Sequence, residues 1–411
     1  MRIVDARNSR AVGRLIASRS AIDGAFRRRV ETIVGDVRRA GDRALFRYAR
    51  RFDAAKPPLE ISRGEIRAGA NRVDRAVRRA IARAADHIAR VAFRQIPEHF
   101  DLQVAPGVIV EQRVEPLESV GCYVPGGRFP LPSSLLMTAV PARVAGVRDI
   151  VAVCPRPEPV VMAAALEAGV TRLFGVGGAH AIAALAYGTR TVPRVDKIVG
   201  PGNRYVATAK AIVARDCAID FYAGPTEVVI VAGSGRADWI AADLIAQAEH
   251  DPDARAILIT WSRALAERVS GAVDRASRGR PIVERSIRAN GAVVVTRSDR
   301  DAMILANRFA PEHLVLDRES LARRSVVAGS VFIGHFSAQA AGDYAIGSNH
   351  VLPTGGAARA RGGLSAADFV RVMSVQRLTR HGLRRLSQTI VPLARAEGLE
   401  AHAESIEIRL K

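Results

Sequence analysis

The chain has few cysteines, few lysines and few aromatic residues for its length of 411 residues. Its three cysteines, Cys122, Cys154 and Cys217, are odd in number, scattered, and never spaced as C-x-x-C. That pattern argues against a disulfide framework and a thiolate zinc site, and it fits a reducing cytoplasm. The chain also lacks an apolar run of about 18 residues and an apolar signal core after Met1, so we predict no membrane partner.

Charge of one sign is in excess, because 61 basic residues outnumber 41 acidic residues and give a net charge of +20. Such an excess is one indication of a nucleic-acid-binding protein. Only four of the basic residues are lysines, however, and the arginines are spread along predicted helices with acids between them. We interpret the excess as a compositional bias and predict no nucleic-acid partner, although the positive field favours an anionic cofactor.

The length and the apolar share of 48% predict two or three folding units with substantial cores. Residues 1–119 are predicted to be mostly helical, with a strand-like alternation near their end. Short apolar runs then alternate with helical segments over 120–225 and again over 226–365, across a Gly- and Pro-bearing joint at 223–226. This alternation predicts an α/β protein with parallel sheets. Residues 366–411 are predicted to form a charged helical arm, which is too short for a core and packs on a partner.

Two pairs of residues in the second half of the chain suit metal binding and proton transfer. Gln247 and His250 are three residues apart on a predicted helix, so an amide oxygen and an imidazole can reach one cation. Glu312 and His313 follow a proline, and a Glu–His pair is suited to moving protons near neutral pH. In a strand these two side chains would point to opposite sides, whereas in a loop both can face one cleft. Taken alone, each pair is more often an ordinary surface feature.

A glycine-punctuated stretch over 342–350 carries Asp343 and His350. Its conformational freedom is typical of a loop that shapes a site, although a polar surface loop has the same composition. Together with the two pairs above, it indicates a metal site beside a proton-transfer pair, and hence an enzyme rather than a binding module.

Three glycine-rich turns, at 123–127, 175–179 and 200–203, follow predicted strands. The second opens a helix and resembles a dinucleotide-binding turn, where free amides meet a pyrophosphate. It is not a complete G-x-G-x-x-G, because His180 stands where the last glycine would be, and as a lone motif it is weak.

Taken in order, eight segments resemble histidinol dehydrogenase from about Val120 to the C-terminus, and more loosely before it. They are GCYVPGGRFPLPSSLLM, GGAHAIAALAYGT, VDKIVGPGNRYVATAK, IDFYAGPTEV, DLIAQAEHDPDA, NRFAPEHLVL, AGDYAIGSNHVLPT and AEGLEAH. The resemblance implies zinc-dependent, NAD-linked oxidation of L-histidinol through L-histidinal to L-histidine. It also implies two Rossmann-like parallel-sheet domains with helical terminal segments, in a homodimer that exchanges its C-terminal arms.

The implied layout has four parts. Residues 1–119 contribute to the first α/β domain, and 120–225 form the NAD-associated Rossmann-like domain. Residues 226–365 complete the first α/β domain and carry the zinc and acid–base residues, and 366–411 form the dimerisation arm.

The resemblance also assigns site residues. Zinc is held by Gln247, His250, Asp343 and His402, the last of them supplied, together with Glu397, to the neighbouring subunit. His313 takes the hydroxyl proton as hydride leaves, and Glu312 activates water on the bound aldehyde. The positions that contact NAD are Tyr123, His180 and Asn203. Those that contact substrate are Thr226, Gln247, His250, His313, Asp343, His350, Glu397 and His402.

Two positions depart from the family's pattern. Thr226 stands where some members have Ser and keeps the hydroxyl. His180 stands where many have Gln, so NAD affinity is expected to vary with pH near about 6–7. Three alternatives stay open: a relative that oxidises another small hydroxylated compound such as a sulfonated diol, a basic nucleic-acid-binding protein on a reused fold, and a catalytically dead paralogue.

Overall fold

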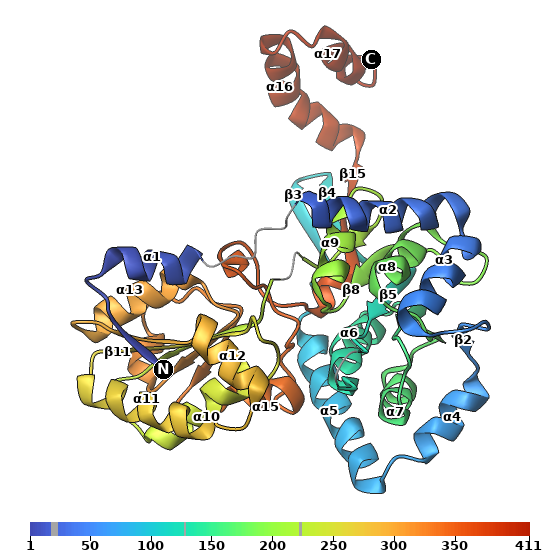
Figure 1. Ribbon diagram of the computed structural model, residues 1–411. Helices are drawn as coiled ribbons and strands as arrows, with labels where there is room; N and C mark the ends of the chain where they lie inside the picture. The colour runs from blue at the N-terminus through green and yellow to red at the C-terminus, as the bar shows by residue number, and fades with distance from the viewer. Residues whose placement is uncertain (18–23, 127–128, 222–223) are drawn as a thin grey trace.

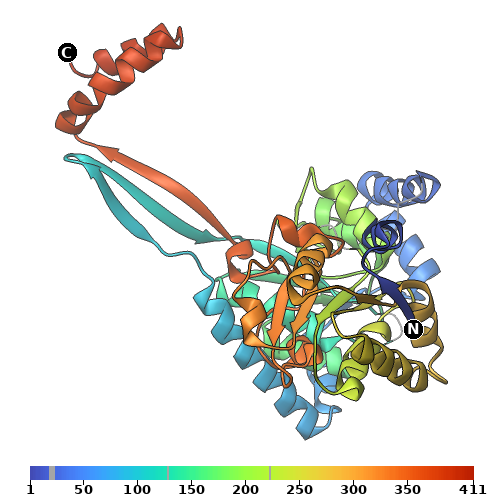
Figure 2. The same cartoon turned by 90° about the vertical axis from the view of Figure 1, so that its left-hand side faces the viewer.

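A computed structural model describes residues 1–17, 24–126, 129–221 and 224–411. Two α/β lobes lie side by side, and a long arm projects away from both (Figures 1 and 2). The glycine turn predicted at 123–127 and the joint predicted at 223–226 lie partly outside the described residues. Within those residues, none of the helices has the length and apolar character that crossing a membrane requires.

The first lobe is built on a six-stranded sheet in the order β2-β7-β6-β5-β8-β9. Its strands are β2 (Glu60–Ile61), β5 (Ser119–Tyr123), β6 (Asp149–Val153), β7 (Arg172–Phe174), β8 (Lys197–Val199) and β9 (Ala218–Ile219). All neighbours pair in parallel except β2, which runs antiparallel to β7. The strands are short apolar runs because helices cover both faces of the sheet.

Alternate side chains of these strands enter two cores. Val120 and Ile150 pack into one core, and Val151 and Ile198 pack into the other. The first core is covered by α5 (Arg75–Arg94), α6 (Pro132–Val144) and α7 (Pro159–Ala168), with α4 (Arg63–Asn71) packed on α7. The second core is covered by α2 (Gly24–Ala40), α3 (Asp42–Tyr48), α8 (Gly178–Tyr187) and α9 (Arg204–Val213), with the π-helix η1 (Ala49–Asp53) after α3.

The second lobe holds another six-stranded sheet, in the order β1-β12-β11-β10-β13-β14, and all its neighbours are parallel. Its strands are β1 (Arg2–Asp5), β10 (Glu227–Val231), β11 (Arg255–Thr260), β12 (Ala292–Val295), β13 (His313–Leu316) and β14 (Ser330–Ile333). One face is covered by α10 (Ala237–Ala248), α11 (Arg263–Ala276) and α12 (Pro281–Asn290). The other is covered by α1 (Ser9–Ala17) and α13 (Asp299–Phe309), while α14 (Glu319–Ala322) follows β13.

These two sheets confirm the α/β class with parallel-sheet lobes. The N-terminal strand β1 was not expected, because residues 1–119 were predicted to be mostly helical, with strand-like alternation only near their end. Arg2–Asp5 becomes a strand by pairing with β12, which lies almost 290 residues later in the chain, and no local pattern reveals that partner.

The arm begins with a three-stranded antiparallel sheet in the order β15-β4-β3. It consists of β3 (Phe100–Ala105), β4 (Val108–Pro116) and β15 (Val370–Leu378), and it leads to α16 (Arg380–Ala396) and α17 (Glu400–Glu407). The prediction of a purely helical segment from residue 366 is therefore wrong at its start, where the 3-10 helix η3 (Ala366–Phe369) precedes β15. Pairing with β4 over nine residues explains β15, and that partner is again distant in the sequence.

Candidate active site

Two of the predicted site residues meet where strands β10 and β13 begin. Thr226 immediately precedes β10, and Glu312 immediately precedes β13. These strands are parallel neighbours with Val228 opposite His313, so their starting ends lie side by side. The Thr226 hydroxyl consequently donates a hydrogen bond to Glu312 Oε2 at 2.5 Å, across 86 positions of sequence.

Gln247 reaches the same place from the last turn of α10. That helix lies between two parallel strands in the sequence, so it runs back along the sheet and its C-terminal end returns to the edge where the strands begin. The Gln247 side chain is fully buried, and its Nε2 donates to Thr226 Oγ1 at 2.6 Å. Its Oε1 has no hydrogen-bond partner. The amide therefore offers a buried, free oxygen ligand.

His250 does not share a helix face with Gln247 in the way predicted. Helix α10 ends at Ala248, and His250 follows the C-cap residue Glu249 in an exposed position. Its backbone N–H still donates to the Gln247 carbonyl, at 3.4 Å, so the two residues stay close through a turn rather than through a continued helix.

Asp343 lies on the short helix α15 (Gln339–Tyr344), where a loop was predicted. Its Oδ2 accepts a hydrogen bond from Gln339 Nε2 at 2.9 Å. Burial raises the pKa of Asp343, and the charges of His313 and His250 act against that rise. Helix α15 packs against α10, so Asp343 lies on the element next to the helix that carries Gln247.

His350 is tied to the same helix. Its Nδ1 lies 3.0 Å from the Asp343 carbonyl oxygen, so the ring donates from Nδ1 and keeps its Nε2 lone pair free. Burial lowers the pKa of His350 to about 4, and the ring is therefore neutral at pH 7.

Glu312 and His313 are both buried, and Glu312 Oε2 lies 3.7 Å from His313 Nδ1. Besides Thr226, the backbone N–H of Glu227 donates to Glu312 Oε2 at 2.8 Å. Burial nevertheless raises the pKa of Glu312 to about 8, with Glu227 and Asp343 adding like-charge repulsion. The adjacent side chains can approach each other because Glu312 precedes the first residue of the strand.

The tautomer of His313 follows from its surroundings. Nδ1 lies 3.3 Å from the Glu227 carbonyl oxygen, which only accepts, so Nδ1 carries the proton and Nε2 keeps a lone pair. Burial lowers the pKa of His313 to about 4. At pH 7 the pair is therefore a neutral imidazole with a free basic nitrogen beside a mostly protonated carboxyl group.

Glu397 and His402 are not brought to this cluster by their own chain. Glu397 is the C-cap of α16, His402 lies on α17, and both are exposed. Figure 2 shows the arm that carries them pointing away from both lobes. Within one chain, Glu397 and His402 are therefore separate from the remaining residues that were predicted to bind zinc and substrate.

Two of the three residues predicted to contact NAD are buried in the first lobe. Tyr123 ends β5 and is 3% exposed, and its hydroxyl oxygen accepts from the Gly178 N–H at 3.1 Å. His180 is 1% exposed, with Nε2 2.9 Å from Asp53 Oδ2. Asp53 Oδ2 also accepts from the Gly177 N–H at 3.0 Å. The expectation of free amides at this turn is therefore wrong for Gly177 and Gly178, because side chains of the protein already occupy them.

Asn203, the third of these residues, is exposed and caps the N-terminus of α9. Its Oδ1 accepts from the backbone N–H groups of Tyr205 at 3.0 Å and Val206 at 3.2 Å, which leaves its amide nitrogen for a ligand. The preceding turn approaches β5 closely, since a Cβ on Gly200 would lie 2.3 Å from the Tyr123 carbonyl oxygen. Gly200 has φ +112°, so glycine is required there on both counts.

Three residues of these networks were missed by sequence reasoning. Gln339 stands one helical turn before Asp343, and that i, i+4 spacing was a usable signal. Asp53 and Glu227 gave no signal, because their partners His180 and Glu312 are 127 and 85 positions away in the chain.

Within the described ranges, no three side chains of His, Cys, Asp or Glu gather as a metal site. The predicted ligand set is consistent with this result, since Gln247 contributes an amide and His402 lies on the arm, which leaves His250 and Asp343. The free, buried Gln247 Oε1 and the Asp343 carboxylate are oxygen donors of a kind that fits Zn²⁺ together with imidazole nitrogen.

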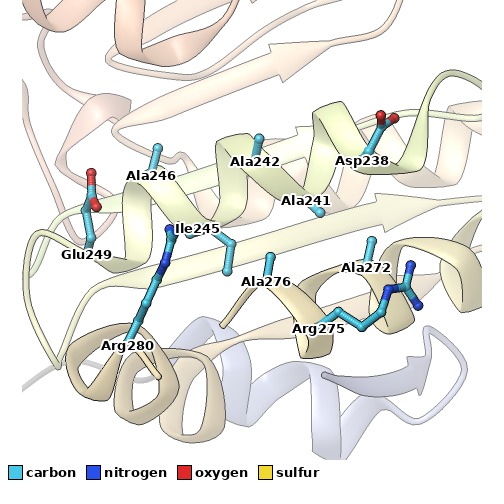
Figure 3. A pocket seen from close by; sticks show the side chains of 10 residues that line it. All are labelled: Asp238, Ala241, Ala242, Ile245, Ala246, Glu249, Ala272, Arg275, Ala276 and Arg280. Atoms are coloured by element: carbon cyan, nitrogen blue, oxygen red, sulfur yellow. The ribbon is translucent and has the colours of Figure 1, made fainter. Parts of the chain in front are cut away.

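A groove of about 520 Å³ lies between α10 and α11 and is separate from this cluster (Figure 3). Five alanines line it with Ile245, and charged residues, among them Asp238 and Arg280, stand at its ends. It contains none of the predicted site residues.

Comparison with known proteins gives consistent matches over nearly the whole chain. The model of the histidinol dehydrogenase family matches residues 17–410. Histidinol dehydrogenase of Syntrophotalea carbinolica is 47% identical over 415 residues, covering 98% of this chain and 96% of the relative. That of Geobacter sulfurreducens is 47% identical and covers 92% of each chain. The crystal structure of histidinol dehydrogenase from Elizabethkingia anophelis matches with a TM-score of 0.92 and 33% identity, covering 98% of this chain and 96% of its own.

Proposed function

The chain belongs to the histidinol dehydrogenase family, and we propose that it oxidises L-histidinol through L-histidinal to L-histidine, with NAD as the hydride acceptor. The observation that carries the proposal is the hydroxyl of Thr226. It hydrogen-bonds both Glu312 and Gln247, and so joins the proton-transfer pair to the amide oxygen proposed as a ligand.

We propose His313 as the base of the oxidation steps. Its protonated Nδ1 donates to the Glu227 carbonyl, which leaves a free lone pair on Nε2 to take the hydroxyl proton as hydride leaves the carbon that bears the hydroxyl. The low pKa of the buried ring keeps that nitrogen unprotonated at neutral pH.

Glu312 serves the hydration of the aldehyde between the two oxidations. Its carboxyl group must lose its proton before it can accept one from water, and the hydrogen bonds from Thr226 and Glu227 favour the charged form against the effect of burial. Enclosing the aldehyde until the second oxidation avoids the release of a reactive species.

Zinc, when bound, would orient the amino and imidazole nitrogens of the substrate, and NAD carries away the hydride. The residues proposed to hold the metal are Gln247, His250, Asp343 and the partner subunit's His402. Thr226 and His350 stand beside them as proposed substrate contacts, and Glu397 of the partner subunit is the proposed contact from the arm.

The arm supplies the argument for a homodimer. Its sheet and helices leave large apolar side chains exposed, which are costly to leave in water when they are contiguous. They are Phe100, Leu102, Val104, Ile109, Val372, Met373, Leu378, Leu393, Leu399 and Ile408. A second copy that covers this surface and receives the arm would complete both sites, because each copy lacks Glu397 and His402 at its own cluster.

NAD is proposed to bind where the strands of the first lobe end. Asn203 offers a free amide nitrogen there, while Tyr123 and His180 shape the neighbouring turn from within. In this proposal residues 120–225 form the NAD-associated lobe together with α2–α5, which corrects the expectation that 1–119 belong to the other lobe. Residues 226–365 carry zinc and acid–base chemistry in the lobe that also includes β1 and α1, and 366–411 form the dimerisation arm.

Steady-state NADH formation, combined with metal analysis of the same preparation, tests the proposal. The zinc-loaded protein should form two NADH per L-histidinol, and a sulfonated diol of similar size should give no comparable rate. Absence of NADH formation with histidinol, in protein shown to contain zinc, would overturn it.

A further inference from the structure

Buried side-chain atoms without a hydrogen-bond partner are few in the described residues, and two of them lie on helices that pack against each other. There are four of them: Thr208 Oγ1, Gln247 Oε1, Asp317 Oδ1 and Gln339 Oε1. The two amide oxygens belong to α10 and α15, which pack against each other. Because a buried acceptor is costly to leave unpaired, such a pair points to a ligand that supplies what the protein does not.

The orientation of the Gln339 amide is fixed by its neighbour. Its Nε2 donates to Asp343 Oδ2 at 2.9 Å, and turning the amide over would place Oε1 against a carboxylate oxygen. Since the two ends of an amide are about 2.2 Å apart, Oε1 lies within roughly 5 Å of that carboxylate oxygen. Gln339 itself is 1% exposed, so Oε1 is also shielded from bulk water.

We propose that Gln339 is a positioning residue of the site, with its nitrogen orienting Asp343 and its oxygen accepting a hydrogen bond from a donor bound beside Asp343. The donor is an N–H or O–H group, supplied by the substrate amine or by a water next to the metal. The inference rests on the proposed zinc and histidinol chemistry. It extends that proposal by adding a residue that touches the ligand shell without belonging to it.

Two variants separate the halves of the amide. Gln339→Met removes donor and acceptor at similar length, and we expect it to lower zinc affinity by about tenfold or more and to raise the KM for histidinol. Gln339→Glu keeps an acceptor oxygen but loses the donor to Asp343 Oδ2, so zinc affinity should stay low while the KM for histidinol moves back towards the wild-type value. Thr208→Val is the matched control, because it removes a buried unpaired hydroxyl from α9 in the other lobe and should change neither quantity.

Zinc affinity is measured in the absence of substrate, by competition with a chromogenic chelator. The KM for histidinol is measured on zinc-saturated dimers. A raised KM at constant zinc affinity assigns the donor to the substrate amine. Lowered zinc affinity, with or without a raised KM, fits a water beside the metal or the loss of the hydrogen bond that orients Asp343, and each of these results supports the inference. Wild-type zinc affinity together with wild-type KM in a folded Gln339→Met protein overturns it. If the unmodified protein neither binds zinc nor oxidises histidinol, the proposed function itself fails, which is a different result.

Discussion

Thr226 Oγ1 lies 2.5 Å from Glu312 Oε2 and donates its only proton to it. The same oxygen accepts from Gln247 Nε2, so the hydroxyl determines which end of that amide faces away as a free oxygen. The methyl group that distinguishes Thr226 from a serine leaves both hydrogen bonds in place. The substrate contact predicted for Thr226 is thereby limited to a group that donates to its remaining lone pair.

Thr226→Val should uncouple Glu312 from Gln247 with little change of side-chain shape. The Thr226 hydrogen bond lowers the pKa of Glu312. Its loss should therefore raise that pKa and shift the pH-dependent increase in rate to higher pH. Turnover should fall by about tenfold or more, because Glu312 and Gln247 each lose a buried partner. Thr226→Ser is the control and should keep the wild-type pH–rate profile. An unshifted increase in Thr226→Val would show that the hydroxyl does not act on Glu312.

The pH dependence of the wild-type enzyme should follow Glu312. Its pKa is raised to about 8, so its base form increases as pH rises through that value, and a nearby bound cation moves the value down. The rate should therefore rise with pH as Glu312 loses its proton, with an apparent pKa at or below about 8. His313, whose pKa is lowered to about 4, should add no pH dependence near neutrality. Glu312→Gln should abolish the rise, and its persistence in that variant would assign it to another group.

His313→Ala should lower turnover by about 10²–10⁴-fold while the protein keeps its zinc, since the ring is held by a backbone carbonyl rather than proposed as a ligand. His250→Ala is the comparison variant and should lose zinc. Metal analysis after dialysis distinguishes the two roles. Loss of zinc from His313→Ala would make His313 a ligand instead of a base.

Exchange of the arm can be tested by mixing inactive subunits. His402→Ala and His250→Ala should each be inactive, whereas their heterodimer should contain one intact site. An equal mixture that re-associates at random should then recover about a quarter of wild-type activity, because about half of the dimers are heterodimers with one working site of two. Failure to recover activity, in a mixture shown to contain heterodimers, would count against a shared site.

Asp53→Ala should affect the cofactor side alone. The Asp53 carboxylate holds His180 and the Gly177 amide, so its loss should loosen the turn and raise the KM for NAD. Zinc content and the KM for histidinol should stay near wild type, because Asp53 belongs to the first lobe. Equal changes in both KM values would indicate general destabilisation instead, which a thermal unfolding measurement would detect.

Helices and strands were predicted best where the local pattern is dense. The alternation of short strands and helices predicted over 120–225 and 226–365 is confirmed, for example by α7 and β13. Predictions were wrong where a partner outside the segment decides the conformation. The strands β1 and β15 form only by pairing with β12 and β4. The start of the stretch 342–350 was predicted to be a loop because of its glycines, although Gly342 lies within the short helix α15.

The sequence by itself determined the α/β class, the family and the residue types of the candidate site, because these depend on apolar periodicity and on ordered motifs along one chain. Only the tertiary structure decided that Thr226 joins Glu312 to Gln247, that Asp53 and Tyr123 occupy two amides of the glycine turn, and that Glu397 and His402 lie away from their own site. The physical reason is that parallel strands align their starting ends and helices return to them. Side chains from distant segments then meet in ways that no local spacing encodes.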